Sequence, residues 1–202
     1  FHPVKTITTG EGGAITTNNE ELYKKLLALR SHGMYKDGKM TSTWEYEMRD
    51  LGFNYRMTDI QAAIGSAQMK KLPDFCRKRK ENFNKWYSIF KQYPDYFILP
   101  EKTEKSDPAW FAFIVTIKEK APFNRNQIIQ HLNNSLIETR NLFAGNMTKQ
   151  PAFLNKNWII SEHLNNTDFV MNNTFFLGTY PGLTQEMFDY SEQVISEFIS
   201  KI

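Results

Sequence analysis

The chain has 202 residues, of which 25 are basic and 22 acidic, and 41% are apolar. This composition is typical of a globular protein with enough apolar side chains for a buried core, and it argues against intrinsic disorder. The formal charge is only +3 and both signs are mixed along the chain, so we expect no nucleic-acid partner.

The residues suited to metal binding or cross-linking are few. The single cysteine, Cys76, permits no internal disulfide, and the four histidines are scattered without metal-ligand spacing. No apolar run approaches the roughly 20 residues of a membrane-spanning helix. From these features we expect a soluble, cytoplasmic protein with no metal ion and no membrane segment.

The chain opens on the segment Phe-His-Pro-Val-Lys-Thr-Ile-Thr-Thr-Gly-Glu-Gly-Gly-Ala, which contains Lys5. By composition alone, Lys5 is a solvated surface side chain. Alternatively, a partly desolvated primary amine can condense with an aldehyde cofactor and then carry a proton. The glycines lack the Gly-x-Gly-x-x-Gly spacing of a dinucleotide loop. Because the chain starts in mid-element without a methionine, we expect it to be the second half of a longer protein.

A strand and a helix are predicted next. The β-branched run at 14–17 is bounded by glycines and asparagines, which favours a strand. Asn19 is a helix-capping residue, and leucines then recur at helical spacing up to Gly33. The polar segment from Ser31 to Glu47 is predicted to be a loop, and its length favours a role at a site or an interface.

A second motif lies between Leu51 and Ala63. Thr58 and Gln61 have the spacing of a capping box, which predicts a helix. Asn54 and Arg56 stand just ahead of that helix start, where anions such as phosphate are favoured. The predicted helix carries an apolar stripe formed by Ile60, Ile64 and Ala67.

Pro73 breaks the helical pattern, and a second helix is predicted from Asp74 to Tyr93. Its aromatic stripe is typical of a core-facing surface. Its basic cluster, 77–80, is interpreted as a solvated helix face. The pattern changes beyond Pro94, so we place a domain boundary there.

The rest of the chain alternates strands and helices. The run 110–117 has the period of a strand, a helix begins after Asn124, 137–142 is a second strand, and Thr184 caps a final helix. This order predicts a small α+β domain. The inward-facing residues of the final helix are expected to be Met187, Val194, Ile195, Phe198 and Ile199.

The loop 138–151 is dense in amides and hydroxyls and contains one arginine, Arg140. Such a loop suits the hydroxyl groups of a sugar, or a carboxylate. A polar surface loop that closes a strand is the alternative. Within it, Arg140, Phe143 and Asn146 are the candidate substrate-binding residues.

The first segment resembles the cofactor-lysine segment of the DegT/DnrJ/EryC1/StrS family of sugar aminotransferases, which use pyridoxal phosphate. The second motif is similar to this family's Gly-x-Asn-x-Arg-Met-x-x-x-Gln-Ala-Ala. The resemblance implies an α/β protein, the C-terminal half of a fold-type I aminotransferase. Residues 1–94 would be the end of the large cofactor-binding domain and 95–202 the small α+β domain. The residues that match the lysine segment are Phe1, His2, Lys5, Glu11, Gly12 and Gly13.

The same resemblance implies roles for individual residues. Lys5 would bind the cofactor covalently and act in catalysis. Asn54 would contact the cofactor phosphate in the neighbouring subunit, with Arg56 beside it, which implies a homodimer with shared active sites. The implied reaction transfers an amino group from glutamate to a keto sugar carried on a nucleoside diphosphate, in lipopolysaccharide or related synthesis, with pyridoxamine phosphate in the half-reaction.

The C-terminal part resembles a different branch. Thr-Arg-x-Leu-Phe-Ala-Gly-Asn, followed by Gln-Pro, looks like the CDP-6-deoxy-4-hexulose 3-dehydrases. Those enzymes carry histidine where this chain has Lys5 and hold pyridoxamine phosphate without a covalent link, so Lys5 favours the aminotransferase. A 3-dehydrase and an inactive C-terminal fragment remain the alternatives.

Overall fold

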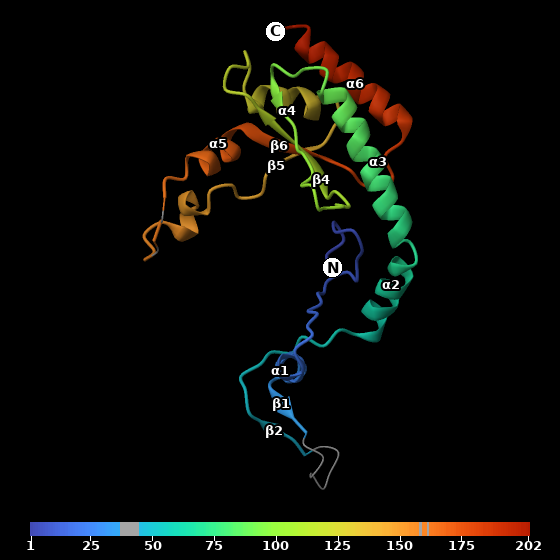
Figure 1. Cartoon of the computed structure of the whole chain (residues 1–202), viewed down its shortest axis with the longest axis vertical. Coiled ribbons are helices and arrows are strands. Elements are labelled where there is room, and N and C mark those ends of the chain that lie inside the picture. The colour runs from blue at the N-terminus through green and yellow to red at the C-terminus, as the bar shows by residue number, and fades with distance from the viewer. Residues whose placement is uncertain (37–44, 158, 161) are drawn as a thin grey trace. The chain divides into compact units, whose positions relative to one another are not determined.

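Figure 1 shows the computed structural model, which describes residues 1–36, 45–157, 159–160 and 162–202. The chain divides into two compact units, Phe1–Leu72 and Pro73–Ile202. This division differs from the boundary expected near Pro94. The reason is that the helix following Leu72 packs its aromatic side chains into the core of the second unit.

The first unit contains two helices and a short pair of strands. They are α1 (Glu20–Arg30), β1 (Met34–Tyr35), β2 (Glu47–Met48) and α2 (Asp59–Met69). Asn19 caps α1 by accepting the Leu22 N–H at 2.9 Å, as predicted. The two strands pair antiparallel at the ends of the expected 31–47 loop, whose residues 37–44 lie outside the described part of the chain.

One expectation for the first unit is wrong. Residues 14–17 form no strand among the described residues, because a strand exists only where a neighbour supplies its ladder of hydrogen bonds. The apolar stripe of α2 is present, but Ile60 is 77% exposed and α2 has no buried residue. Helical spacing predicts the helix, whereas burial of its stripe requires a facing element.

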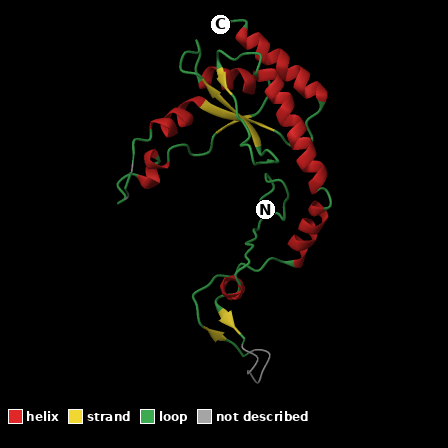
Figure 2. Cartoon of the chain, viewed as in Figure 1, coloured by secondary structure: helices red, strands yellow, loops and turns green. Residues whose placement is uncertain are grey.

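The second unit combines a sheet with helices (Figure 2). Its sheet is antiparallel throughout, with the strand order β3-β4-β6-β5. Two single-turn 3₁₀ helices, η1 (Met147–Lys149) and η2 (Pro151–Phe153), follow β5. The other elements are α3 (Leu72–Phe90), β3 (Phe97–Ile98), β4 (Ala112–Ile117), α4 (Arg125–Asn134), β5 (Thr139–Asn141), α5 (Asn165–Asn173), β6 (Thr174–Gly178) and α6 (Gln185–Ile199).

The core of this unit lies between the sheet and three helices. Alternate residues of β4 and β6 point to the side occupied by α3, α4 and α6, where Phe90, Phe113 and Phe175 are fully buried. Aromatic rings from these elements pack against one another, as in the stack of Phe83 on Trp110 at 4.0 Å. The predicted helix break is confirmed, since α2 ends at Met69 and α3 begins at Leu72.

The sequence pattern misses β3, α5, the central strand β6 and the two 3₁₀ helices of the second unit. Four of the five residues of β6 are buried, including the polar Thr174, so the strand shows no alternation of apolar and polar residues. The final helix is correct, although Met187 is exposed and does not face inward as expected.

The basic cluster of α3 is only partly a solvated face. Arg77 is exposed and pairs with Asp74 and Glu81. Arg79 is only 5% exposed, and its Nη1 donates to the backbone carbonyls of Trp110 and Phe111, both at 3.2 Å. Desolvation lowers the pKa of this guanidinium. These bonds attach α3 to the residues that lead into β4.

Candidate active site

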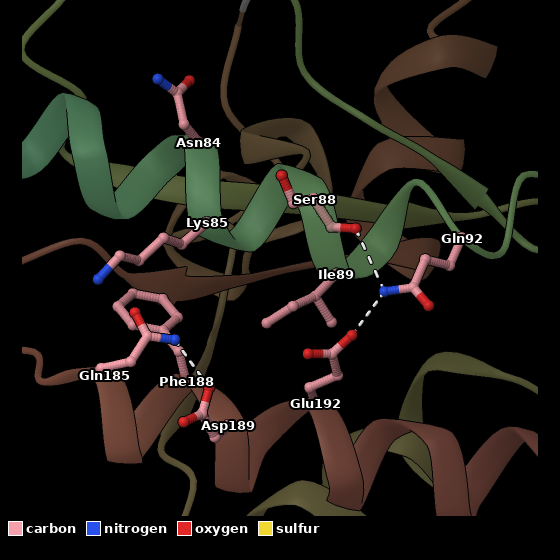
Figure 3. A pocket seen from close by; sticks show the side chains of 9 residues that line it. All are labelled: Asn84, Lys85, Ser88, Ile89, Gln92, Gln185, Phe188, Asp189 and Glu192. Carbon is pink, nitrogen blue, oxygen red and sulfur yellow. Dashed lines mark hydrogen bonds between the residues drawn. The ribbon is translucent and has the colours of Figure 1, made fainter.

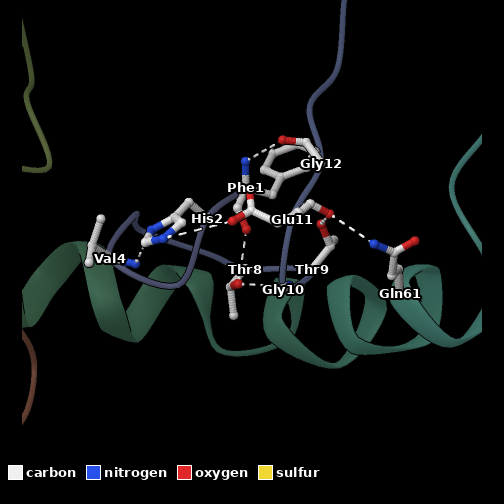
Figure 4. A network of polar contacts seen from close by, with 9 residues as sticks. All are labelled: Phe1, His2, Val4, Thr8, Thr9, Gly10, Glu11, Gly12 and Gln61. Atoms are coloured by element: carbon white, nitrogen blue, oxygen red, sulfur yellow. Dashed lines mark hydrogen bonds and ion pairs between the residues drawn. The ribbon is translucent and has the colours of Figure 1, made fainter. Parts of the chain in front are cut away.

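The first twelve residues fold back on themselves to form a closed loop (Figure 4). The Phe1 nitrogen donates to the carbonyl of Gly12 at 2.7 Å, and the Thr9 N–H donates to the carbonyl of Phe1 at 3.0 Å. Inside the loop, the Lys5 N–H donates to the carbonyl of His2 at 2.9 Å. Lys5 therefore lies in a turn, and its side chain is exposed.

The lysine loop, residues 1–13, lies directly on α2. Gln61 Nε2 donates to the carbonyl of Glu11 at 3.3 Å. A Cβ at Gly12 would lie 2.7 Å from the Cε of Met57, and one at Gly65 would lie 2.9 Å from the Cγ2 of Thr9. A side chain at either position would require these neighbouring side chains to shift.

Gln61 makes hydrogen bonds in two places, and the sequence indicates only one of them. Its Oε1 accepts from the Thr58 N–H at 3.0 Å and completes the predicted capping box. Its Nε2 makes the bond to the lysine loop, at a sequence separation of 50 residues. No local pattern indicates the second bond.

His2 is a further residue with a role that the sequence does not reveal. Its Nδ1 accepts from the Val4 N–H at 3.3 Å, and its Nε2 faces the Glu11 carboxylate at 3.8 Å. Because Nδ1 is an acceptor, the ring proton of neutral His2 lies on Nε2, toward the carboxylate. The ring therefore accepts one hydrogen bond within the turn and lies near the Glu11 carboxylate.

The segment that contains Asn54 is held against the end of α1. His32 N–H donates to the carbonyl of Phe53 at 3.0 Å, and Tyr55 N–H donates to the carbonyl of Arg30 at 2.9 Å. Gly52 lies so close to the backbone that a Cβ would fall 2.5 Å from the carbonyl oxygen of Leu29. Backbone bonds on either side of Asn54 thus fix its position.

The side chains of Asn54 and Arg56 interact. Arg56 Nε lies 3.0 Å from Asn54 Oδ1. Arginine Nε is only a donor, so the atom it contacts must be the amide oxygen, and the orientation of the amide is settled. The Nδ2 group of Asn54 has no partner among the described residues. Asn54 therefore presents a pair of N–H donors suited to an anionic oxygen.

The helix start itself does not supply the anion site that its position suggested. Thr58 Oγ1 already accepts the Gln61 N–H at 3.3 Å, and Asp59 places a carboxylate in the first turn of α2. A filled cap and a negative charge both disfavour a bound phosphate there. Any phosphate contact would come from the side chains of Asn54 and Arg56.

The other predicted site residues lie in the second unit, in the loop after β5. Phe143 is 71% exposed and its φ of 49° is in the left-handed region. Arg140 is exposed, and its Nε and Nη2 donate to Glu138 at 3.0 and 2.9 Å. Both side chains are therefore accessible at the surface of this unit.

Asn146 departs from the expected substrate contact. It is only 2% exposed, its Nδ2 donates to Asp168 at 2.7 Å, and its Oδ1 accepts from the Thr148 N–H at 3.0 Å. The latter bond caps η1. Since both amide atoms are engaged, Asn146 holds the loop together and its side chain is not available to a substrate in this arrangement.

A separate surface hollow lies between α3 and α6 and measures about 300 Å³ (Figure 3). The Nζ of Lys85 sits 4.9 Å from the ring centroid of Phe188, which forms part of the hollow's lining. None of the predicted site residues lines this hollow. It is distinct from the candidate active site.

No group of three or more histidine, cysteine, aspartate or glutamate side chains is arranged to hold a metal ion within the described ranges. Of the helices in the described part, none combines the length and the apolar character needed to cross a membrane.

Comparison with known proteins gives one family and several relatives. Residues 1–197 match the DegT/DnrJ/EryC1/StrS aminotransferase family. The lipopolysaccharide biosynthesis protein RfbH of Salmonella typhimurium is 38% identical over 98% of this chain and 50% of its own length. The chain thus spans about half the length of the curated relatives that it matches.

Solved structures of two activities resemble the fold. GDP-4-keto-6-deoxy-D-mannose-3-dehydratase of E. coli with bound hydrated PLP matches with a TM-score of 0.83 and 29% identity, over 95% of this chain and 51% of that chain. PseC, an aminotransferase of Helicobacter pylori involved in the biosynthesis of pseudoaminic acid, matches with a TM-score of 0.86 and 26% identity, over 100% and 52%. The fold is that of the C-terminal half of fold-type I aminotransferases.

The bond between Gln61 and the lysine loop can be tested with an isosteric change. Gln61→Glu keeps an acceptor for the capping box but removes the Nε2 donor. We expect unchanged helicity and a loss of about 0.5–1.5 kcal/mol in the free energy of local opening of the loop. Hydrogen exchange of the Gly10 and Gly12 amides measures this loss. Gln61→Ala, which removes both bonds, should lower helicity as well, and unchanged exchange in Gln61→Glu would contradict the assignment.

The loop after β5 should depend on pH through Asp168. Bonds from Lys149 and then Asn146 lower the pKa of this carboxyl. A lowered pKa in the folded state stabilises the protein above the unfolded value of about 3.9, and this contribution is lost as the pH falls through the folded value. The pKa values of the Asp74, Asp107 and Glu186 carboxyls are also lowered, so all variants should lose stability in acid. In urea unfolding between about pH 7 and pH 2.5, Asp168→Asn should lose less stability than the parent protein.

Asp95→Asn is the matched control for this experiment, because Asp95 is exposed ahead of β3. It should retain the pH dependence of the parent. Equal acid sensitivity in Asp168→Asn and the parent would show that the carboxylate does not stabilise the loop.

Proposed function

Because the chain belongs to the DegT/DnrJ/EryC1/StrS aminotransferase family, we propose that it contributes the cofactor lysine and the substrate loop of a pyridoxal-phosphate enzyme that acts on a nucleotide-linked keto sugar. Glutamate is the proposed amino donor. The product is an amino sugar on the same nucleotide carrier.

The observation that carries this proposal is the packing of the lysine loop on α2. The bond from Gln61 to Glu11, together with the close contact of Met57 with Gly12, brings the Lys5 loop to the helix that follows Asn54 and Arg56. One compact unit therefore holds both groups, and we propose that it presents the amine to its own site and the amide donor to the site of a second copy.

The residues present suit pyridoxal phosphate. Because Asn54 Oδ1 accepts from Arg56, Asn54 Nδ2 is left to donate, and a phosphate oxygen is a suitable acceptor. Lys5 offers a primary amine. When bound, this cofactor supplies an aldehyde that accepts an amino group and a ring that takes up electrons.

Lys5 is proposed to hold the cofactor and to move a proton. With the cofactor bound, the Nζ of Lys5 as a free base would take up a proton from the substrate and give it back during the reaction. Arginine cannot replace it, because a guanidinium stays protonated near neutral pH. The hydrogen bond from the Val4 N–H to His2 Nδ1 lies within the turn that carries Lys5.

We assign Asn54, with Arg56, to the phosphate of the cofactor bound by a second copy of the protein. Each active site of the proposed homodimer then contains residues of both subunits. Arg140 and Phe143 are assigned to the substrate, whereas Asn146 keeps their loop in shape through its bonds to Asp168 and Thr148.

Removal of the sugar's 3-hydroxyl is the second candidate function. It is favoured by the similarity to GDP-4-keto-6-deoxy-D-mannose-3-dehydratase over 95% of the chain. The presence of Lys5 favours the aminotransferase, because transfer of an amino group requires a basic amine at this position.

The first test locates the cofactor. After borohydride reduction of the protein with pyridoxal phosphate, peptide mapping should find the cofactor attached to Lys5. Lys5→Arg should abolish the adduct and the visible absorbance. The control Lys24→Arg changes an exposed lysine in the same unit, paired with Glu20, and should leave both intact.

An adduct on any other lysine would overturn the assignment of Lys5. Bound pyridoxamine phosphate that never becomes attached, together with loss of the sugar's 3-hydroxyl, would establish the dehydrase instead.

The second test asks whether active sites are shared. Asn54→Ala removes one charge-assisted hydrogen bond, so we expect cofactor affinity to fall by about 1.5–3 kcal/mol. Mixing Asn54→Ala with Lys5→Ala subunits should restore activity, because each mixed dimer has one intact site. With random exchange at equal amounts, about a quarter of the parent activity is expected for a two-fold dimer.

Asn54→Asp provides a matched control, since it keeps the acceptor for Arg56 but replaces the donor with a negative charge. It should retain less cofactor than Asn54→Ala. A mixture that stays inactive although the subunits exchange would show that each site is built from one chain.

A further inference from the structure

The segment that contains Lys5 is closed into a ring at one atom, the carbonyl oxygen of Phe1. From the far side of Lys5, the Thr8 hydroxyl donates to this oxygen at 2.9 Å, and the Thr9 N–H donates to it at 3.0 Å (Figure 4). The two ends of the segment are therefore tied together, and Lys5 lies between them.

The hydroxyl of Thr8 makes a second hydrogen bond, because Oγ1 also accepts from the Gly10 N–H at 2.9 Å. A backbone N–H can only donate and a carbonyl oxygen can only accept, so the hydroxyl proton lies toward Phe1. The bonds form a chain from Gly10 through Thr8 to Phe1, in which each bond strengthens the next. Gly10 has a φ of 79°, in the left-handed region, so Thr8 also holds the point where the chain reverses direction.

The neighbouring Thr9 attaches this closure to the rest of the unit. Thr9 is only 5% exposed, and its Oγ1 donates to the carbonyl of Glu11 at 2.7 Å. Its Cγ2 packs against α2 at Gly65, where an added Cβ would lie 2.9 Å away. Because this end of the ring is held on α2, the bonds to the Phe1 carbonyl also fix the segment around Lys5 relative to that helix.

Lys5 depends on the closure because regular secondary structure does not hold it. Residues 1–9, all of them described, contain no helix or strand. Of the two bonds that close the ring, the one from the Thr9 backbone is open to any residue except proline. The one from Thr8 requires a hydroxyl. A reacting amine must be held in the productive geometry by its supporting residues, and a small displacement lowers reactivity.

We propose that Thr8 is a positioning residue for Lys5: its hydroxyl, bonded to Phe1 and Gly10, holds the amine where it can attach to the aldehyde of the cofactor. The inference rests on the proposed function, in which Lys5 binds pyridoxal phosphate. A threonine that only stabilises the loop is the alternative, and its loss would weaken the binding of every cofactor analogue alike. A positioning residue affects only the ligand that reacts with the amine.

Thr8→Val tests the proposal, because it removes the hydroxyl and keeps the shape of the side chain. The variant is titrated with pyridoxal phosphate, whose aldehyde reacts with lysine, and with deoxypyridoxine phosphate, which carries a methyl group in place of the aldehyde. Loss of hydrogen bonds of ordinary strength should lower the affinity for pyridoxal phosphate about 2- to 13-fold. The affinity for deoxypyridoxine phosphate should equal that of the parent.

The control variants separate the hydroxyl from the rest of the side chain. Thr8→Ser keeps the hydroxyl and should restore the affinity of the parent for pyridoxal phosphate. Thr6→Val is the matched control, since Thr6 lies in the same loop and its hydroxyl makes no hydrogen bond among the described residues. It should bind both ligands as the parent does. Hydrogen exchange of the Gly10 amide should become faster in Thr8→Val and not in Thr6→Val.

Circular dichroism melting verifies that each variant is folded, and Thr8→Ala is a second variant without the hydroxyl if Thr8→Val melts early. Unchanged affinity for pyridoxal phosphate in the variants without the hydroxyl would overturn the proposal. An equal loss for both ligands would make Thr8 a structural residue only. Failure of Thr8→Ser to restore binding, or unchanged exchange of the Gly10 amide in Thr8→Val, would also overturn it.

This result is separable from that for the proposed function. A parent protein in which borohydride reduction never attaches the cofactor to Lys5 would refute the proposed function and the inference together. Attachment to Lys5 in the parent, with the same affinity for pyridoxal phosphate in Thr8→Val, would refute the inference alone.

Discussion

One hydrogen bond, from Gln61 to the carbonyl of Glu11, joins the two segments on which the proposed chemistry depends. The lysine loop has internal bonds that close it, and the segment around Asn54 has its own bonds to the end of α1. Neither set relates the loop to the segment. Gln61, the third residue of α2 and a member of its capping box, does so, and the loop packs closely on α2 at Gly65.

In the second unit, too, one polar side chain joins segments that are distant in the sequence. A buried guanidinium, Arg79, is surrounded by backbone carbonyls, and its Nε has no hydrogen-bond partner among the described residues. Burying a charged side chain without a carboxylate partner costs free energy. Arg79 is buried nonetheless, and its hydrogen bonds fix the residues that lead into β4. Arg79 also holds the backbone carbonyl of Phe111, whose ring stacks on that of Phe143.

The sequence predicts local features well where one short-range interaction decides them. The caps formed by Asn19, Thr58 and Asn124 are all present, because each is a bond between residues three apart. The sequence does not predict features that depend on a partner far away along the chain. Residues 14–17 have no partner strand among the described residues. Arg79 is buried, unlike the neighbouring Arg77, because it donates to carbonyls 31 and 32 residues away.

By itself, the sequence determined the family motifs around Lys5 and Asn54, the helix starts and the polar character of the 138–151 loop. These depend on residue type and spacing, which are local. Only the tertiary structure decided that Arg56 orients the amide of Asn54, that Asn146 is engaged within its own loop, and that Phe111 joins Phe143. Each of these is set by which groups meet in space, and no periodicity records the direction of a hydrogen bond or the neighbour of a ring.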